Sequence, residues 1–202
     1  GAAFVSIVSQ SPDLLKGIDS KRIATFQKAA GTALNKYRQY VQSDKISWTV
    51  IASPSEAWAE KVVPNLPKEK QVDALWDAIF KATRSNLENP VEAWTKHNDT
   101  LHEKVHYLNA KKYAKLHYTA PGTDLTIELP KGHLWCGAGS VNEKGEEFMA
   151  NMPTEEVFTV PHKDGVNGYV ASTKPLSYGG NIIDNFKITF ENGRITNVEA
   201  EQ

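Results

Sequence analysis

The first half of the chain alternates between short apolar runs and segments whose apolar residues recur every three or four positions. Residues 4–9 (FVSIVS) form a β-branched run that predicts a strand, and residues 46–54 (ISWTVIASP) form a nearly continuous apolar run typical of a strand covered on both faces. Helical spacing of apolar residues predicts helices over residues 20–41 and 68–84. This alternation of strands and helices predicts an α/β layer.

In the second half the apolar period changes to two. Leu125, Ile127 and Leu129 occupy alternate positions, which predicts a strand with one buried face. Near the carboxyl end, the Asn192-Gly193 dipeptide separates two alternating runs and supplies the positive φ angles of a type I′ turn, so a β-hairpin is expected there. The second half is therefore predicted to be β-rich.

The two periodicities divide the chain into two parts. Residues 1–110 are predicted to be a partial α/β domain with strand-helix alternation, and residues 111–202 the β-rich part of a second domain. No internal repeat or low-complexity segment interrupts either part.

Composition and charge exclude several kinds of partner. Of the 202 residues, 40% are hydrophobic and 23% are charged, as in ordinary globular proteins. The chain has 23 Lys and Arg against 24 Asp and Glu, with no long run of one sign, so a nucleic acid or an anionic membrane is not expected as a partner. Cys136, the single cysteine, cannot form an internal disulfide, and this favours a reducing cytoplasm.

The stretch HEKVH matches the H-E-x-x-H pattern in which two histidines on one helix bind zinc and a glutamate acts as general base. The residues concerned are His102, Glu103 and His106. Leu101 and Val105 continue an apolar packing stripe, and each histidine follows one of them by about 100° around the helix. We interpret the pair as partly solvated flank residues, while a zincin-type peptidase remains the alternative.

A second pair of possible metal ligands occurs in the stretch PHKDG. His162 and Asp164 have an H-x-D spacing, but Pro161 and Gly165 flank them. Proline, aspartate and glycine in this order are typical of a turn. The turn is therefore the favoured interpretation.

Two adjacent carboxylates precede an apolar run in the stretch NMPTEEVFTVP. Successive side chains of a strand point to opposite faces, so Glu155 and Glu156 are directed apart, and at least one can enter the interior. A buried carboxylate needs a cation, hydrogen-bond donors or a raised pKa, and a bound metal ion is one common solution. A salt bridge at the end of the strand is the other.

Several stretches in order, GTDLTIELPKGHLW, NMPTEEVFTVP, VNGYVASTKPLSYGG and ITFENGRITNVEAEQ, resemble the middle of the aminopeptidase T and PepS family of metallo-aminopeptidases. The stretch SWTVIASPSEAWAEKV in the first half agrees as well, so the resemblance covers essentially the whole chain.

The resemblance implies a fragment of a two-domain α/β plus α+β enzyme. In this family the enzyme is a cytoplasmic exopeptidase, usually a homodimer, that removes residues from the amino termini of peptides. It uses two divalent metal ions per active site, which can be zinc, cobalt, manganese or magnesium. The match places one metal ligand at Glu156. Glu155 is the less favoured position, because the core of the family motif is Glu-Val-Phe.

The chain departs from the family pattern in its ligand set. The other ligands of the family are a second glutamate, two histidines and an aspartate with a tyrosine nearby, and they follow the segment that matches NVEAEQ, where this sequence stops. A catalytic zinc needs about three protein ligands. We therefore expect an internal fragment, about the middle half of the enzyme, that is inactive alone and binds metal poorly. A non-catalytic dimerisation or peptide-binding module is the alternative.

Overall fold

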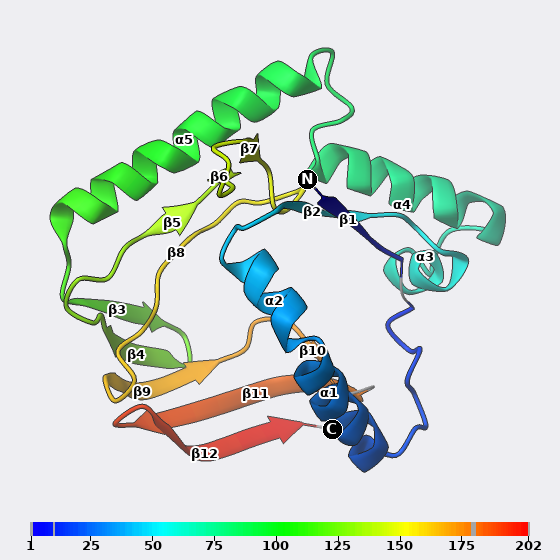
Figure 1. Cartoon of the computed structure of the whole chain (residues 1–202). Coiled ribbons are helices and arrows are strands. Elements are labelled where there is room, and N and C mark those ends of the chain that lie inside the picture. Colours follow the sequence, from blue (N-terminus) through cyan, green and yellow to red (C-terminus); the bar gives the residue numbers. More distant parts are fainter. Residues whose placement is uncertain (1, 10, 179–180, 202) are drawn as a thin grey trace. The chain divides into compact units, whose positions relative to one another are not determined.

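The computed structural model describes residues 2–9, 11–178 and 181–201 of the chain. These residues form two compact units, and Figure 1 labels their helices and strands. The first unit comprises the described residues up to His102 together with Gly137–Glu156. The second comprises Glu103–Cys136 and the described residues from Val157 onward. The last boundary between the units therefore falls directly after Glu156.

The first unit combines a parallel strand pair with helices. β1 (Ala3–Val8) pairs in parallel with β2 (Ser47–Ala52), as the connecting helices require. The helices are α1 (Ser20–Ala33), α2 (Asn35–Gln42), α3 (Glu56–Val62), α4 (Lys68–Ala82) and the start of α5 (Pro90–Lys111). A short antiparallel pair follows, made of β6 (Ser140–Val141) and β7 (Glu147–Phe148). Within the described residues, no helix combines the length and the apolar character that crossing a bilayer requires.

One predicted helix is interrupted. The side chain of Asp19 accepts a hydrogen bond from the Lys21 amide at 2.8 Å and caps α1, but the expected helix over residues 20–41 breaks at Leu34, where φ is −93° and ψ is 8°. Gly31 and Thr32 in the preceding turn have low helix propensity, which weakens the chain at this point.

The burial of β2 also differs from the sequence prediction. All six of its residues are half-buried, whereas coverage of both faces was expected. The reason is that β1 and β2 form a two-stranded sheet in the described chain, and β1 is exposed along its length. Val5 and Ile7 in β1 are 62% and 63% exposed.

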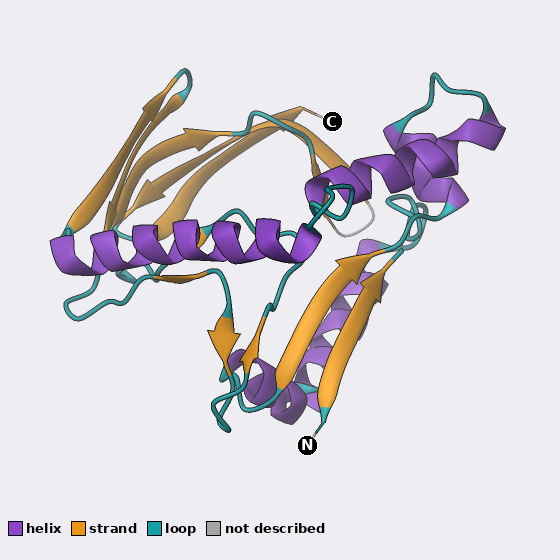
Figure 2. Cartoon of the chain, turned by 90° about the horizontal axis from the view of Figure 1, so that it is seen from above, coloured by secondary structure: helices purple, strands orange, loops and turns teal. Residues whose placement is uncertain are grey.

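The second unit is dominated by an antiparallel sheet, drawn in orange in Figure 2. Its strand order is β10-β11-β9-β4-β3, and β12 pairs with β11. The strands are β3 (Lys115–Ala120), β4 (Thr123–Glu128), β9 (Val166–Ala171), β10 (Leu176–Tyr178), β11 (Asn181–Glu191) and β12 (Arg194–Glu201). Two further short strands, β5 (Cys136–Gly137) and β8 (Val157–Phe158), lie where the chain passes from one unit to the other.

The period-two predictions in this unit are confirmed. β11 and β12 form the expected hairpin, and Asn192 and Gly193 at its turn have φ angles of 49° and 75°. Leu125 and Leu129 are buried, as their alternate positions predicted. Strand-helix alternation in the first half and a β-rich second half are thus both present.

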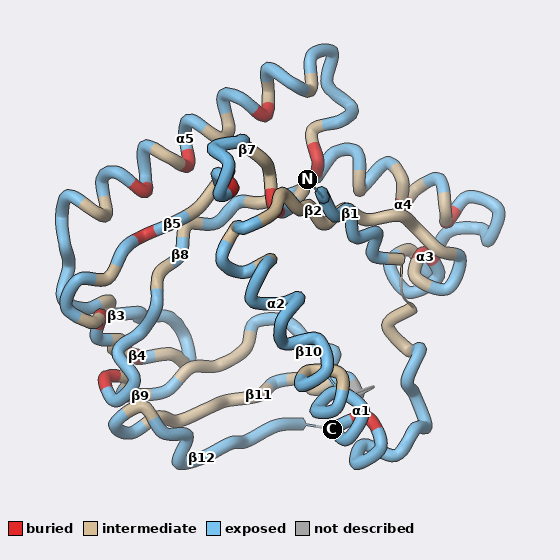
Figure 3. The backbone as a smooth tube through the Cα atoms, viewed as in Figure 1, coloured by how far each residue is buried: buried red, intermediate tan, exposed pale blue. Residues whose placement is uncertain are grey.

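Few of the described residues are buried, and they occur singly along the backbone, where Figure 3 colours them red. On α5 they recur at helical spacing. The buried apolar residues among those described are Ile23, Ala59, Leu75, Trp94, Leu101, Val105, Leu125, Leu129, Trp135 and Ala150.

Candidate functional site

Residues 150–156, which carry Glu155 and Glu156, are called the candidate segment. This segment begins beside the parallel strands of the first unit. The Val50 amide of β2 donates to the Ala150 carbonyl at 2.9 Å, and the Met152 amide donates to the Val50 carbonyl at 3.0 Å. Asn151 and Val50 thus form an isolated parallel bridge. These bonds fix the backbone a few residues before Glu155 and Glu156.

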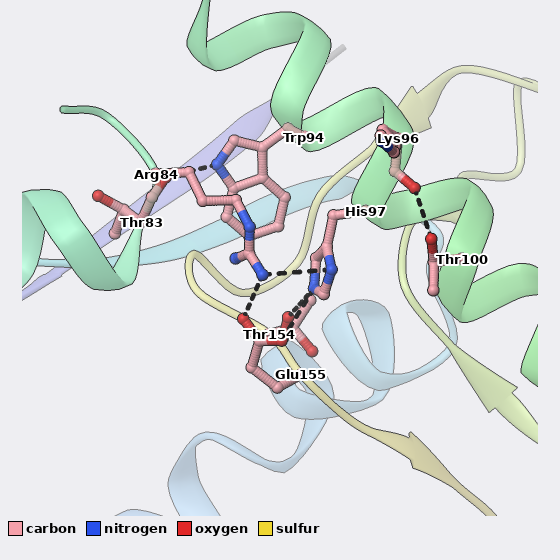
Figure 4. A network of polar contacts seen from close by, with 8 residues as sticks. All are labelled: Thr83, Arg84, Trp94, Lys96, His97, Thr100, Thr154 and Glu155. Carbon is pink, nitrogen blue, oxygen red and sulfur yellow. Dashed lines mark hydrogen bonds and ion pairs between the residues drawn. The ribbon is translucent and has the colours of Figure 1, made fainter. Parts of the chain in front are cut away.

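Arg84 approaches the same segment from the end of α4. Its φ angle is 60°, in the left-handed region that usually favours glycine or asparagine. The Arg84 amide donates to the Lys81 carbonyl at 3.2 Å and the Ser85 amide to the Phe80 carbonyl at 2.9 Å, which is the Schellman pattern of a helix end. An arginine at this position has a backbone cost, yet its guanidinium is directed toward the candidate segment (Figure 4).

Trp94 holds this helix end in place. Its indole Nε1 donates to the Thr83 carbonyl at 2.6 Å, and its ring lies under the Arg84 guanidinium at 5.3 Å from the centroid. Thr83 and Trp94 are both buried. The carbonyl groups at a helix end lack intrahelical partners, so the indole satisfies one that would otherwise be unpaired.

His97 joins Arg84 to the candidate segment. Its Nδ1 lies 3.2 Å from Nη2 of Arg84, and its Nε2 lies 2.8 Å from the Thr154 carbonyl oxygen (Figure 4). A guanidinium has only donors, so Nδ1 must accept. This pattern assigns the ring proton to Nε2, which donates to Thr154. The imidazole is largely enclosed, with 13% of its side chain exposed.

Glu155 is engaged by the same two residues. Its Oε1 lies 2.8 Å from Nη2 of Arg84, and its Oε2 lies 3.3 Å from Nε2 of His97. These contacts agree with the interpretation of the carboxylate pair as the site of a salt bridge. Because the Glu155 side chain is 62% exposed, the ion pair contributes only about 0–1 kcal/mol to stability.

Glu156 is exposed and lies outside any named strand. Among the described residues, no hydrogen bond or ion pair engages its carboxylate. Of the two candidates, Glu155 therefore faces cationic and donor groups, whereas the oxygens of Glu156 are open to a further ligand.

The HEKVH residues occupy the flank position expected from the sequence. Leu101 and Val105 are buried, His102 is half-buried and His106 is exposed. Within the described part of the chain, no three His, Cys, Asp or Glu side chains gather as a metal site would need. The zincin-type alternative stays a hypothesis.

The PHKDG stretch forms the predicted turn. The Gly165 amide donates to the His162 carbonyl at 3.0 Å, and the Asp164 amide donates to Nδ1 of His162 at 3.4 Å. The His162 ring thus serves the local backbone, which agrees with the turn interpretation.

A cavity of about 680 Å³ opens in the first unit beside the start of α5. Trp94, Phe148 and Met152 give it an apolar wall, and Asn98 and Asp99 add polar groups. His102 is the one sequence-predicted candidate that lines it, and Glu155 and Glu156 do not. The cavity and the candidate carboxylates are therefore separate features.

Sequence reasoning missed the residues that hold the candidate segment. Arg84 follows a helical stripe, but helix ends are normally recognised by glycine or asparagine, so nothing marked it. His97 offered a weak signal, because it lies three residues after Trp94 and hence on the same side of the helix.

Comparison with known proteins identifies the family. The sequence model described as "Thermophilic metalloprotease (M29)" matches residues 1–202. Aminopeptidase AmpS of Bacillus subtilis is 67% identical over 202 residues, covering 100% of this chain and 49% of the relative. Aminopeptidase T of Thermus thermophilus is 40% identical, covering 100% and 50%.

A solved structure agrees with the fold. Wild-type AmpT from Thermus thermophilus superposes with a TM-score of 0.90 at 38% identity, over 100% of this chain and 49% of that one. The resemblance found in the sequence motifs is confirmed, and so is the expected fold class, a fragment of a two-domain enzyme. The chain spans about half the length of the relatives it matches, and it belongs to the thermophilic metalloprotease (M29) family.

Proposed function

We propose that this chain is part of a metal-dependent aminopeptidase that hydrolyses amino-terminal residues from peptides. The observation that carries the proposal is the 67% identity to Aminopeptidase AmpS over all 202 residues. The TM-score of 0.90 to wild-type AmpT supports it, because the backbone that would place the site is shared.

Glu156 is the residue of this chain that would bind the metal. Its carboxylate is exposed and free of the Arg84 and His97 contacts that engage Glu155. A carboxylate beside a guanidinium is a poor ligand, since the metal cation would be placed near a second positive charge. The geometry thus favours Glu156 over Glu155.

The described residues supply one ligand, Glu156, and do not complete a metal site. A catalytic zinc typically has about three protein ligands, and no group of three comes together among the residues described. We propose that two divalent ions (zinc, cobalt, manganese or magnesium) are held jointly by Glu156 and by residues that these 202 do not provide. Such ions, when bound, polarise a carbonyl group and lower the pKa of bound water. The 202-residue chain alone is accordingly expected to be inactive and to bind metal poorly.

The remaining assignments extend the same proposal. Peptides are the substrates, and the enzyme is a cytoplasmic homodimer. Residues 1–110 belong to its α/β domain, and residues 111–202 form the β-rich part of its second domain. Two observations support association with further polypeptide. Val5 and Ile7 of β1 are exposed although parallel strands are normally covered, and β12 exposes Ile195 and Val198.

The test places these 202 residues within the full length of a relative, of which they span about half. In a chimera, they replace the matching stretch of Aminopeptidase AmpS, and hydrolysis of a leucyl chromogenic substrate is measured beside the 202-residue chain alone. We expect activity in the chimera and none in the isolated chain. A folded chimera without activity, or full activity in the isolated chain, would contradict the proposal.

A further inference from the structure

We propose that Arg84 and His97 are positioning residues, which hold the backbone at Thr154 and Glu155 so that the neighbouring Glu156 carboxylate is presented to the metal. The inference rests on the proposed function for the identity of the ligand. It adds two residues of this chain that do not themselves touch the metal.

The segment is anchored at two successive points before Glu156. Met152 is bonded to β2 through the Val50 carbonyl, and Thr154 is bonded through its own carbonyl to His97 at 2.8 Å. Glu156 is the second residue after Thr154. The chain is therefore fixed up to the candidate ligand, and the first unit ends there.

The anchor formed by Arg84 and His97 is largely enclosed, and both nitrogens of its imidazole are paired. His97 is 13% exposed and Arg84 is 24% exposed. Both imidazole nitrogens are used, one accepting from Arg84 and one donating to Thr154. The ring cannot rotate without breaking both bonds, so its orientation is fixed by the same logic that fixes metal-binding histidines through their outer partners.

The backbone of Arg84 also points to a role for its side chain. Its φ angle of 60° favours glycine, and a glycine at this helix end would form the same Schellman bonds. Helix capping therefore does not explain an arginine here. The guanidinium, which contacts His97, Glu155 and the Trp94 ring, does.

This conflict between backbone and side chain gives a sharp test in the AmpS chimera. Arg84→Gly removes the guanidinium and relieves the backbone, so the variant is expected to fold. Its matched control is Lys112→Gly, because Lys112 also follows a helix with a positive φ angle, of 50°, and is not part of the anchor.

A second pair of variants removes the imidazole. His97→Phe keeps a ring that can pack edge-on against Trp94, as His97 does at 5.6 Å, but it has neither nitrogen. His133→Phe is the control, since His133 packs edge-on against Trp135 at 6.4 Å and its Nδ1 lies 3.0 Å from a backbone carbonyl oxygen three residues away.

Two readouts separate a positioning role from a merely structural one. Zinc affinity is measured by competition with a chromogenic chelator, and release of the segment is measured as cleavage by a glutamate-specific protease after Glu155 or Glu156, identified by mass spectrometry. We expect Arg84→Gly and His97→Phe to weaken zinc binding about tenfold or more and to speed cleavage at these sites. The two controls should change neither.

The outcomes distinguish the inference from the proposed function. Unchanged zinc affinity in Arg84→Gly and His97→Phe would overturn the inference, even if cleavage became faster. A folded parent chimera that binds no zinc would overturn the proposed function and the link to a metal with it. In that case faster cleavage would still show that the two residues hold the segment.

Discussion

The indole of Trp94 provides a quantitative test of the site's internal hydrogen bonding. Trp94→Phe deletes the Nε1 group that donates to the Thr83 carbonyl at 2.6 Å, and both residues are buried. The Thr83 carbonyl at the end of α4 then loses the hydrogen bond that the indole donates. Leaving a buried acceptor unpaired costs about 1–3 kcal/mol.

Trp135 is a matched control for the loss of ring size. It is as buried as Trp94, at 9% exposed, but its Nε1 is enclosed without a hydrogen-bond partner in the described chain. Trp135→Phe therefore removes an unsatisfied donor, while the smaller ring costs a similar amount at both positions. We expect Trp94→Phe to lower the free energy of unfolding by about 2 kcal/mol more than Trp135→Phe does.

The measurement is native-state amide hydrogen exchange with peptide-level resolution, which reports the opening free energy of each unit separately. This matters because Trp94 lies in the first unit and Trp135 in the second. Equal losses at the two positions, or a larger loss for Trp135→Phe, would refute the reasoning from hydrogen bonding.

Two further predictions concern the sheet of the second unit and the pH dependence of the first. Gly168 has φ of 111°, and an added Cβ would clash with the backbone oxygen of Asp124 in the neighbouring strand β4. We therefore expect Gly168→Ala to lower the free energy of unfolding in urea by at least about 3 kcal/mol. The control is Gly132→Ala, where φ is 82° but the space is open, and a loss of about 1 kcal/mol is expected. Similar values for the two glycines would contradict this. Nζ of Lys61 lies 2.5 Å from Oδ2 of Asp13. Lys61 lowers the pKa of the Asp13 carboxyl, mainly through this hydrogen bond. The folded state therefore resists protonation, so the pair's contribution is present above the ordinary aspartate pKa of about 3.9 and is lost as the pH falls below it. Asp13→Asn should flatten the stability profile in this range, and an unchanged profile would count against the pairing.

The parts of the fold that follow from local sequence could be predicted. Asn192 and Gly193 specify a turn through their own backbone preferences, and Leu125 and Leu129 report one buried face through their spacing. The break at Leu34 could not be read in the same way, because no proline or glycine occupies that position and the apolar spacing continues through it.

The candidate site, too, could be predicted from the sequence only in part. The motif resemblance pointed to Glu155 and Glu156, and a strand-end salt bridge was one of the two interpretations offered for them. The partners of Glu155 lie far away in sequence, however, at Arg84 and His97. Contacts over such separations depend on how α4 and α5 are packed, and apolar periodicity carries no information about which polar side chain will meet which.

The most direct test of Glu156 as a metal ligand is the metal content of the AmpS chimera, measured by inductively coupled plasma mass spectrometry after extensive dialysis. Glu156→Gln and Glu155→Gln are compared with the parent chimera, since each replaces one carboxylate by a neutral amide of the same shape. We expect about two divalent ions per chain in the parent and in Glu155→Gln, and a clear loss in Glu156→Gln. Retention of metal in Glu156→Gln together with its loss in Glu155→Gln would contradict the assignment of Glu156 as the metal ligand.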